Sequence, residues 1–178
     1  HSVDEEYTDL FDINSDGLPD VLVTAAGLDG PGHGVFFNGI SSFGAATLMS
    51  INGVLGADAS TITLHNPNVT SLDIDGDGRV NLVHVPIAKT YAVYDALQKG
   101  GNWYWQGREI AVATNQNVKI DFGRDTYDVQ VVDVNFDGLV DVVVSTGTEF
   151  QSFFSLGRLP GGDGQFGHGK WQSATTST

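Results

Sequence analysis

Carboxylate and carboxamide side chains recur three times in this chain at the spacing of a metal-binding loop. Each nine-residue copy has an acid or amide at its first, third, fifth and ninth positions and glycine at its sixth. The copies read DINSDGLPD (12–20), DIDGDGRVN (73–81) and DVNFDGLVD (133–141). Alternating oxygen ligands on a curled backbone suit Ca²⁺, and glycine permits the curl because it enters the left-handed region at little cost. The pattern predicts about three Ca²⁺ ions, one in each loop.

Each loop is expected to supply ligands of two kinds, side-chain oxygens and the backbone carbonyl of its seventh residue. The carbonyl ligands would come from Leu18, Arg79 and Leu139. The side-chain ligands would be Asp12, Asn14, Asp16 and Asp20 in the first loop, Asp73, Asp75, Asp77 and Asn81 in the second, and Asp133, Asn135, Asp137 and Asp141 in the third.

Two further motifs begin with a similar spacing of acids and amides. An EF-hand needs a bidentate Glu at its twelfth position and a helix on each side, but that position is Val23, His84 or Val144, and short β-branched runs flank each loop. An Asx-rich hairpin turn without metal is the remaining alternative. We favour calcium, because such a turn does not need carboxylates at further alternate positions and a crowded cluster would repel itself.

The elements that position the loops form a repeat. Successive copies begin 61 and 60 residues apart, and short apolar runs separated by turns follow each copy. About four strands in about 60 residues is the size of a β-propeller blade. We expect blades over 7–66, 67–126 and 127–171, and a small, polar, disordered tail over 172–178.

Composition excludes several classes of protein. The chain has 178 residues, 40% of them hydrophobic, and no cysteine, which argues for a globular fold without disulfides. Its net charge is −14, but nine of its 22 acidic residues lie in the three loops, so three Ca²⁺ ions would leave −8. The eight Lys and Arg residues are scattered, and no apolar run has transmembrane length. We therefore expect neither nucleic-acid binding nor membrane insertion.

No catalytic pattern stands out. The G-x-G-x-x-G match at 162–167 lacks a following helix, the histidines lack zinc spacing, and no G-x-S-x-G elbow occurs. Asp95 and Asp125 have no identifiable partner, and His84 is expected to be a partly buried, hydrogen-bonded residue. The aromatic run Trp103 to Trp105, with Trp171, is expected to pack between blades, with a carbohydrate platform as the alternative.

The loop D-x-[DN]-x-D-G-x-x-[DN], the period near 60 and a later Phe-Gly pair resemble the FG-GAP and VCBS repeats of integrin-type propellers. The phrases SDGLPDVLVT, GVFFNG, DGLVDVVVSTGTE and FFSLGRLPGGDGQFG resemble the repeat region of insecticidal toxin complex B components and plasmid virulence proteins. The resemblance implies a propeller in a large secreted toxin, which helps to enclose the cargo and docks onto the pore-forming component. It also implies that the calcium loop is structural and joins the first two strands of a blade. Asn81 departs from the acid usual at position nine, and one fewer charge puts in doubt the strength of the middle site but not its existence.

These observations predict an all-β fold in which 1–178 form one propeller segment of three four-stranded blades. Known propellers have about four to eight blades, so we expect either part of a larger propeller or one completed by oligomerisation, for example as a homodimer. The expected function is a non-catalytic, calcium-stabilised structural and docking module of a secreted, toxin-like protein, whose partners are other blades or subunits. The alternative is a calcium-dependent adhesin or lectin-like propeller that binds a glycan. An enzyme with its site at the propeller axis ranks third.

Overall fold

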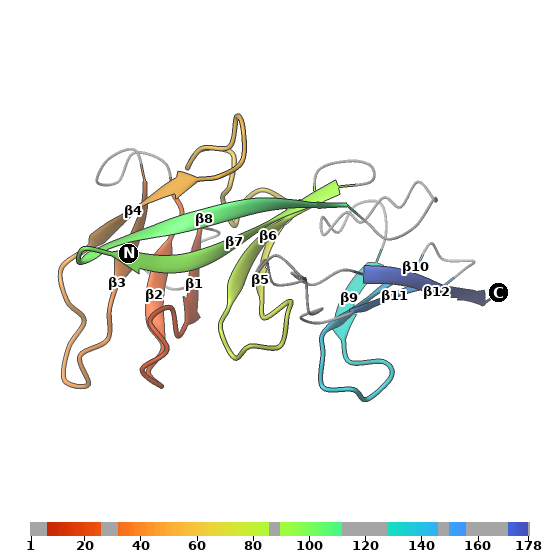
Figure 1. Ribbon diagram of the computed structural model, residues 1–178. Helices are drawn as coiled ribbons and strands as arrows, with labels where there is room; N and C mark the ends of the chain where they lie inside the picture. The colour runs from red at the N-terminus through yellow and green to blue at the C-terminus, as the bar shows by residue number, and fades with distance from the viewer. Residues whose placement is uncertain are drawn as a thin grey trace.

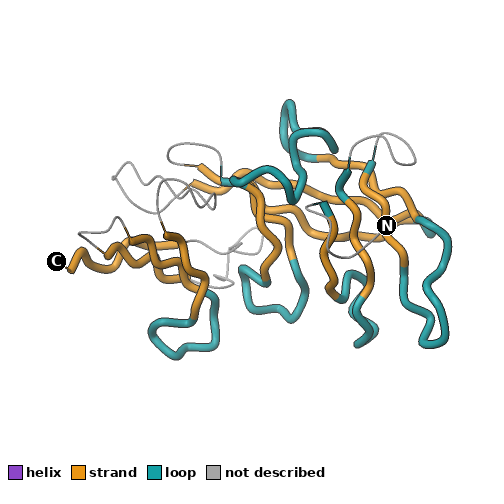
Figure 2. Tube along the Cα trace, turned by 180° about the vertical axis from the view of Figure 1, so that it is seen from behind, coloured by secondary structure: helices purple, strands orange, loops and turns teal. Residues whose placement is uncertain are grey.

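The computed structural model describes residues 7–25, 32–85, 90–111, 128–145, 150–155 and 171–177, which are built of strands and turns with no helix in these ranges (Figure 1, Figure 2). The predicted all-β class is confirmed. The strands are β1 (Thr8–Phe11), β2 (Asp20–Val23), β3 (His33–Phe36), β4 (Thr47–Asn52), β5 (Val69–Leu72), β6 (Asn81–His84), β7 (Thr90–Lys99), β8 (Asn102–Ala111), β9 (Asp128–Val132), β10 (Asp141–Ser145), β11 (Phe150–Ser155) and β12 (Trp171–Ser177).

The strands form two sheets, where separate blades were predicted. Strands β1–β4, β5–β8 and β9–β12 each pair antiparallel in chain order, and we call them the first, second and third sets. The first two sets are joined, because β4 pairs parallel with β8 through Ser50↔Tyr104 and Ile51↔Trp105. The result is a curled eight-stranded sheet in the order β1-β2-β3-β4-β8-β7-β6-β5, beside a four-stranded sheet. Three separate four-stranded blades are thus not confirmed, because the open edge of β4 finds backbone partners on the long strand β8.

The nine-residue loops occupy equivalent places in the three sets. Each loop joins the first strand of its set to the second, and the last residue of the first strand faces the ninth loop residue. These pairs are Phe11↔Asp20, Leu72↔Asn81 and Val132↔Asp141. The three loops project from the same side of the sheets (Figure 1).

The second set is buried on both faces, as period-two alternation in a strand allows. Leu82 and Tyr94 pack into a core shared with the first set, which we call the first core. Val83 and Val93 point the other way, into a second core shared with Val142 and other residues of the third set. The sets therefore stack face to face, and the middle one has no solvent face around these residues.

The aromatic run of β8 lies largely in the first core. Trp105 is fully buried there, and Trp103 is half-buried with its ring 5.4 Å from that of Phe37. Core packing, the preferred interpretation of this run, agrees with these positions. The side chain of Trp171 lies outside the described residues.

The C-terminal segment forms a strand where the composition predicted a disordered tail over 172–178. In β12, Gln172 pairs with Phe154 and Thr176 with Gln151. Backbone groups make these pairs, and β-branched threonine favours extended structure, so a polar composition does not prevent a strand there.

We predict that His33 makes the stability of the fold depend on pH. His33 is fully buried in β3, and burial lowers its pKa from 6.5 to about 4, against the opposing effect of the backbone of Ala59 and Ile62. Between these values the unfolded chain binds the proton more readily, so stability falls as the pH drops. His33 alone should lower the free energy of unfolding by roughly 3 kcal/mol between pH 7 and pH 4.

Urea unfolding of the wild type and of His33→Gln at several pH values, in a chelating buffer, measures this effect. The variant should lose that part of the pH dependence. An identical pH dependence in both proteins would show that His33 is not the responsible group.

Candidate metal centres

Each loop curls through two residues in the left-handed backbone region. The sixth-position glycines were predicted to adopt it, whereas the fourth position was missed, although the middle loop carries glycine there too. The angles φ are 61° at Ser15, 71° at Gly76 and 61° at Phe136 for the fourth position, and 88° at Gly17, 84° at Gly78 and 85° at Gly138 for the sixth. Left-handed residues at alternate positions wrap the chain, so that the backbone amides around them point inward.

The first-position carboxylate is the hub of each loop. In the middle loop, Asp73 accepts hydrogen bonds from the backbone N–H of Asp77 at 3.1 Å and of Gly78 at 2.9 Å. Asp12 and Asp133 accept the equivalent pairs in the other loops, at 3.0 and 2.8 Å and at 3.2 and 2.9 Å. These bonds join groups of the same loop and hold its backbone around the first-position carboxylate.

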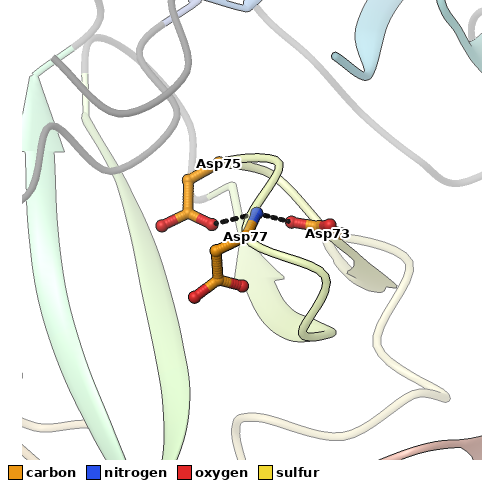
Figure 3. A group of neighbouring side chains, drawn as sticks. All are labelled: Asp73, Asp75 and Asp77. Carbon is orange, nitrogen blue, oxygen red and sulfur yellow. Dashed lines mark hydrogen bonds between the residues drawn. The ribbon is translucent and has the colours of Figure 1, made fainter. Parts of the chain in front are cut away.

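The middle loop brings three carboxylates together. Asp73, Asp75 and Asp77 each have an oxygen atom within 4.8 Å of the others, and the N–H of Asp77 donates to both Asp73 and Asp75 (Figure 3). Asp75 is only 6% exposed. Like charges this close repel one another, and a divalent cation between them would convert that repulsion into attraction. This is the strongest candidate metal centre among the described residues.

The two outer loops contain less charge repulsion than the middle loop, because their third residue is an asparagine and not an aspartate. Asn14 donates to the Asp16 carboxylate at 2.9 Å, and Asn135 donates to Asp137 at 2.8 Å. A hydrogen bond thus replaces one of the carboxylate repulsions found in the middle loop. The doubt that Asn81 raises about the strength of the middle site stays untested by this geometry.

The ninth-position side chains lie beneath the loops and are buried, at 0% exposure for Asp20 and Asp141 and 3% for Asn81. One oxygen of each accepts the N–H of the second loop residue, at 3.0 Å from Ile13, 3.2 Å from Ile74 and 3.0 Å from Val134. These bonds close the base of each loop. The role of the ninth residues as metal ligands stays a prediction.

The second oxygen of the ninth-position aspartates ties the loop to the end of the third strand of its set or to the residues just after it. Asp20 accepts the N–H of Asn38 at 2.8 Å, and Asp141 accepts that of Ser155 at 2.7 Å. Burial raises the pKa of Asp20, against the opposing effect of the N–H groups of Asn38 and Ile13. A buried carboxylate is therefore held in place by two backbone donors.

Asn81, the ninth residue of the middle loop, is also buried and hydrogen-bonded, but its amide group donates a hydrogen bond where the aspartates accept a second one. Its amide donates to Asp95 of β7 at 2.8 Å, and Asp95 is also paired with Arg108 of β8. Sequence reasoning found no partner for Asp95. The signal was the amide itself, because a buried Asn has a donor that an Asp lacks and needs an acceptor.

The residues predicted to supply carbonyl ligands make hydrogen bonds through their backbone N–H groups. The N–H groups of Leu18, Arg79 and Leu139 donate to the fifth-position carboxylates at 2.9, 2.8 and 2.8 Å. Metal coordination by their carbonyl groups stays a prediction. The G-x-G-x-x-G segment 162–167 and Asp125 lie outside the described residues, and in the described part no helix is long and apolar enough to cross a membrane.

Comparison with known proteins finds a similar fold among the solved structures. No protein-family model and no curated protein matches the chain. Among solved structures, a chain in the Tc holotoxin pore of Photorhabdus luminescens is similar, with a TM-score of 0.58 and 20% sequence identity over 97% of this chain. The match covers 7% of that chain, so the present sequence spans only a small part of its length. At this identity the likeness shows a shared all-β fold and nothing about activity.

We predict that the ninth position stabilises the fold without calcium. Asp20→Ala leaves the N–H groups of Ile13 and Asn38 without their acceptor, which should lower the free energy of unfolding by about 2–4 kcal/mol. Asp16→Ala removes an exposed carboxylate and should cost about 1 kcal/mol or less in the absence of calcium. Urea unfolding in a chelating buffer measures both. Equal losses in the two variants would contradict the role assigned to Asp20.

Proposed function

We propose that this chain is a non-catalytic, calcium-stabilised β-propeller module with a structural and protein-docking role in a secreted, toxin-like protein. The observation that carries the proposal is the convergence of Asp73, Asp75 and Asp77 in a loop whose design is repeated in two other sets. Such sites stabilise a fold because the cation binds the folded chain and not the unfolded one.

Calcium would bind carboxylate oxygens that also accept the loop's own hydrogen bonds. Backbone amides satisfy much of the hydrogen-bonding capacity of Asp73, but carboxylate oxygens have further lone pairs available for a cation. When bound, the cation would supply positive charge at the point where three carboxylates meet. Its role is to hold the loop and its two strands together.

The stacking of the sets supports a propeller module. The second set is buried on both faces, against the first set through Leu82 and against the third through Val83. Blades of a propeller pack in this face-to-face manner. The likeness to a segment of the Tc holotoxin pore agrees with a toxin-associated setting, and we infer secretion from that setting.

The docking role is inferred from equivalent positions in the three sets. Phe11 and Leu72 face the next set along the chain and are each 8% exposed, whereas their equivalent in the third set, Val132, is 48% exposed. The second loop residue repeats this contrast, with Ile74 at 0% and Val134 at 37%. The third set thus presents the face that the other two sets bury. We infer that another four-stranded unit of the same kind covers it.

The glycan-binding alternative is not favoured. Its aromatic platform would need exposed rings in β8, but Trp105 is fully buried, and Trp103 is half-buried with its ring tilted against that of Phe37. A saccharide cannot lie on a ring that the first core encloses.

We predict that calcium raises the melting temperature. At a concentration about tenfold above the dissociation constant, each occupied site adds about 1.4 kcal/mol of stability, which corresponds to a few degrees in a chain of this size. Asp77→Asn should reduce the shift, because it removes one of the three converging charges. Asp128→Asn, an exposed change in β9, is the charge-matched control and should retain it. A melting temperature that stays the same after chelation and calcium return would sink the calcium assignment.

We also predict that the uncovered face of the third set makes the isolated chain self-associate. Sedimentation velocity over a range of concentrations should show reversible association, and Val132→Asp should abolish it by placing a charge on the apolar face. Ile40→Asp, a change at an exposed apolar residue of another loop, should leave it unchanged. The docking assignment fails if the wild type is monomeric throughout or if both variants behave alike.

A further inference from the structure

A second candidate site lies away from the nine-residue loops, at the other ends of the strands. It is a pocket of about 240 Å³ between the face of β6, β7 and β8 and the loop that follows β4. In Figure 1 this loop lies opposite the nine-residue loops. Its volume is below the range of about 300–1,000 Å³ typical of pockets for drug-sized ligands. The space therefore suits a small group.

The strand register explains how the pocket forms. His84 pairs with Ala92, and Ala92 pairs with Glu109, so the three residues form one row across the sheet. Neighbouring strands are about 4.8 Å apart, which places the backbones of His84 and Glu109 about 10 Å apart. The small side chain of Ala92 lies between them and leaves space above the sheet for the pocket.

Tyr94 supplies one wall from the next row, where it pairs with Gly107. A Cβ on Gly107 would lie 2.4 Å from the Tyr94 ring and 2.9 Å from Val54, so the missing side chain makes room for both. Tyr94 is fully buried, and its hydroxyl has no hydrogen-bond partner among the described residues. A buried hydroxyl without a partner costs free energy, so a ligand whose entry opens the space beside this hydroxyl would supply its missing partner.

The polar groups of the pocket form a set of acceptors. Glu109 carries the one formal charge among the described lining residues. Burial, aided by the charge of Glu109, raises the pKa of Tyr94 to about 12, so the hydroxyl stays neutral and its oxygen can accept. Burial lowers the pKa of His84, which favours a neutral ring with one accepting nitrogen.

We propose that this pocket binds a short alkylammonium group, either a free amine or a lysine side chain of a partner. An ammonium ion has three N–H donors, which match the Glu109 carboxylate, the Tyr94 oxygen and the His84 ring nitrogen. The apolar loop residues Val54 and Leu55 would contact the aliphatic stem. An anion is disfavoured because Glu109 would repel it, as would a chain of net charge −14. The proposal does not rest on calcium binding.

Isothermal titration calorimetry of the full chain with small ligands tests the class of ligand. We expect saturable binding of n-butylammonium and weaker or no binding of n-butanol, which has the same stem without the charge. Equal binding of n-butanol would overturn the proposal, as would a preference for methyl glucoside. Comparable binding of Nα-acetyl-lysine methylamide would point to a lysine side chain as the source, and its failure beside bound n-butylammonium would point to a free amine.

Three variants test the residues. Glu109→Gln should weaken n-butylammonium binding by roughly two- to fivefold, because it removes the charged acceptor, whose exposed position lets solvent screen its charge. Tyr94→Phe should weaken it by about three- to tenfold, while the melting temperature of the free protein stays equal or rises, because the lost hydroxyl had no partner. Asp128→Asn removes the same charge as Glu109→Gln on another sheet and should leave binding intact. Unchanged binding by Glu109→Gln, or an equal loss in Asp128→Asn, would show that the pocket does not recognise the ammonium group.

Discussion

The rest of the structure depends on one buried hydrogen-bonding group in each set, the side chain at the ninth loop position. Asp20 and Asp141 each accept two backbone N–H groups, one from within the loop and one from Asn38, just after β3, or Ser155, at the end of β11. The loop, the first hairpin and the next strand are thereby fixed to each other at one point. Buried polar groups are costly unless satisfied, so the arrangement is specific as well as stabilising.

The same groups link the middle set to the third. The Ser155 N–H donates to Asp141, and its hydroxyl donates to the Ile74 carbonyl at 3.2 Å. Ile74 in turn donates its N–H to Asn81, whose amide reaches the Asp95–Arg108 pair. Close packing accompanies this chain of bonds, since a Cβ on Gly76 would lie 2.5 Å from the Leu139 side chain. Two candidate metal loops therefore share a boundary.

The second set carries a candidate site at each of its two ends. At the loop end, three carboxylates converge, as the ligands of a hard cation would. The side chain buried beneath this loop accepts a backbone N–H group. At the opposite end, His84, Tyr94 and Glu109 gather around the small residue Ala92 on the face shared with the first set. Acceptors dominate both ends, which agrees with the acidic character of the chain.

The sequence by itself determined the features that depend on local chemistry. The strand class, the three loops, the convergence of their first, third and fifth residues and the left-handed glycines at position six all follow from residue types at fixed short spacings. Only the tertiary structure decided the rest, because it depends on residues far apart in the chain. The parallel pairing of β4 with β8, the burial of Asp20 against Asn38, the partner of Asp95 and the pocket around Tyr94 each join segments that no local pattern connects. Polar residues such as Thr176 also pair as a strand because backbone groups, which every sequence shares, make the bonds.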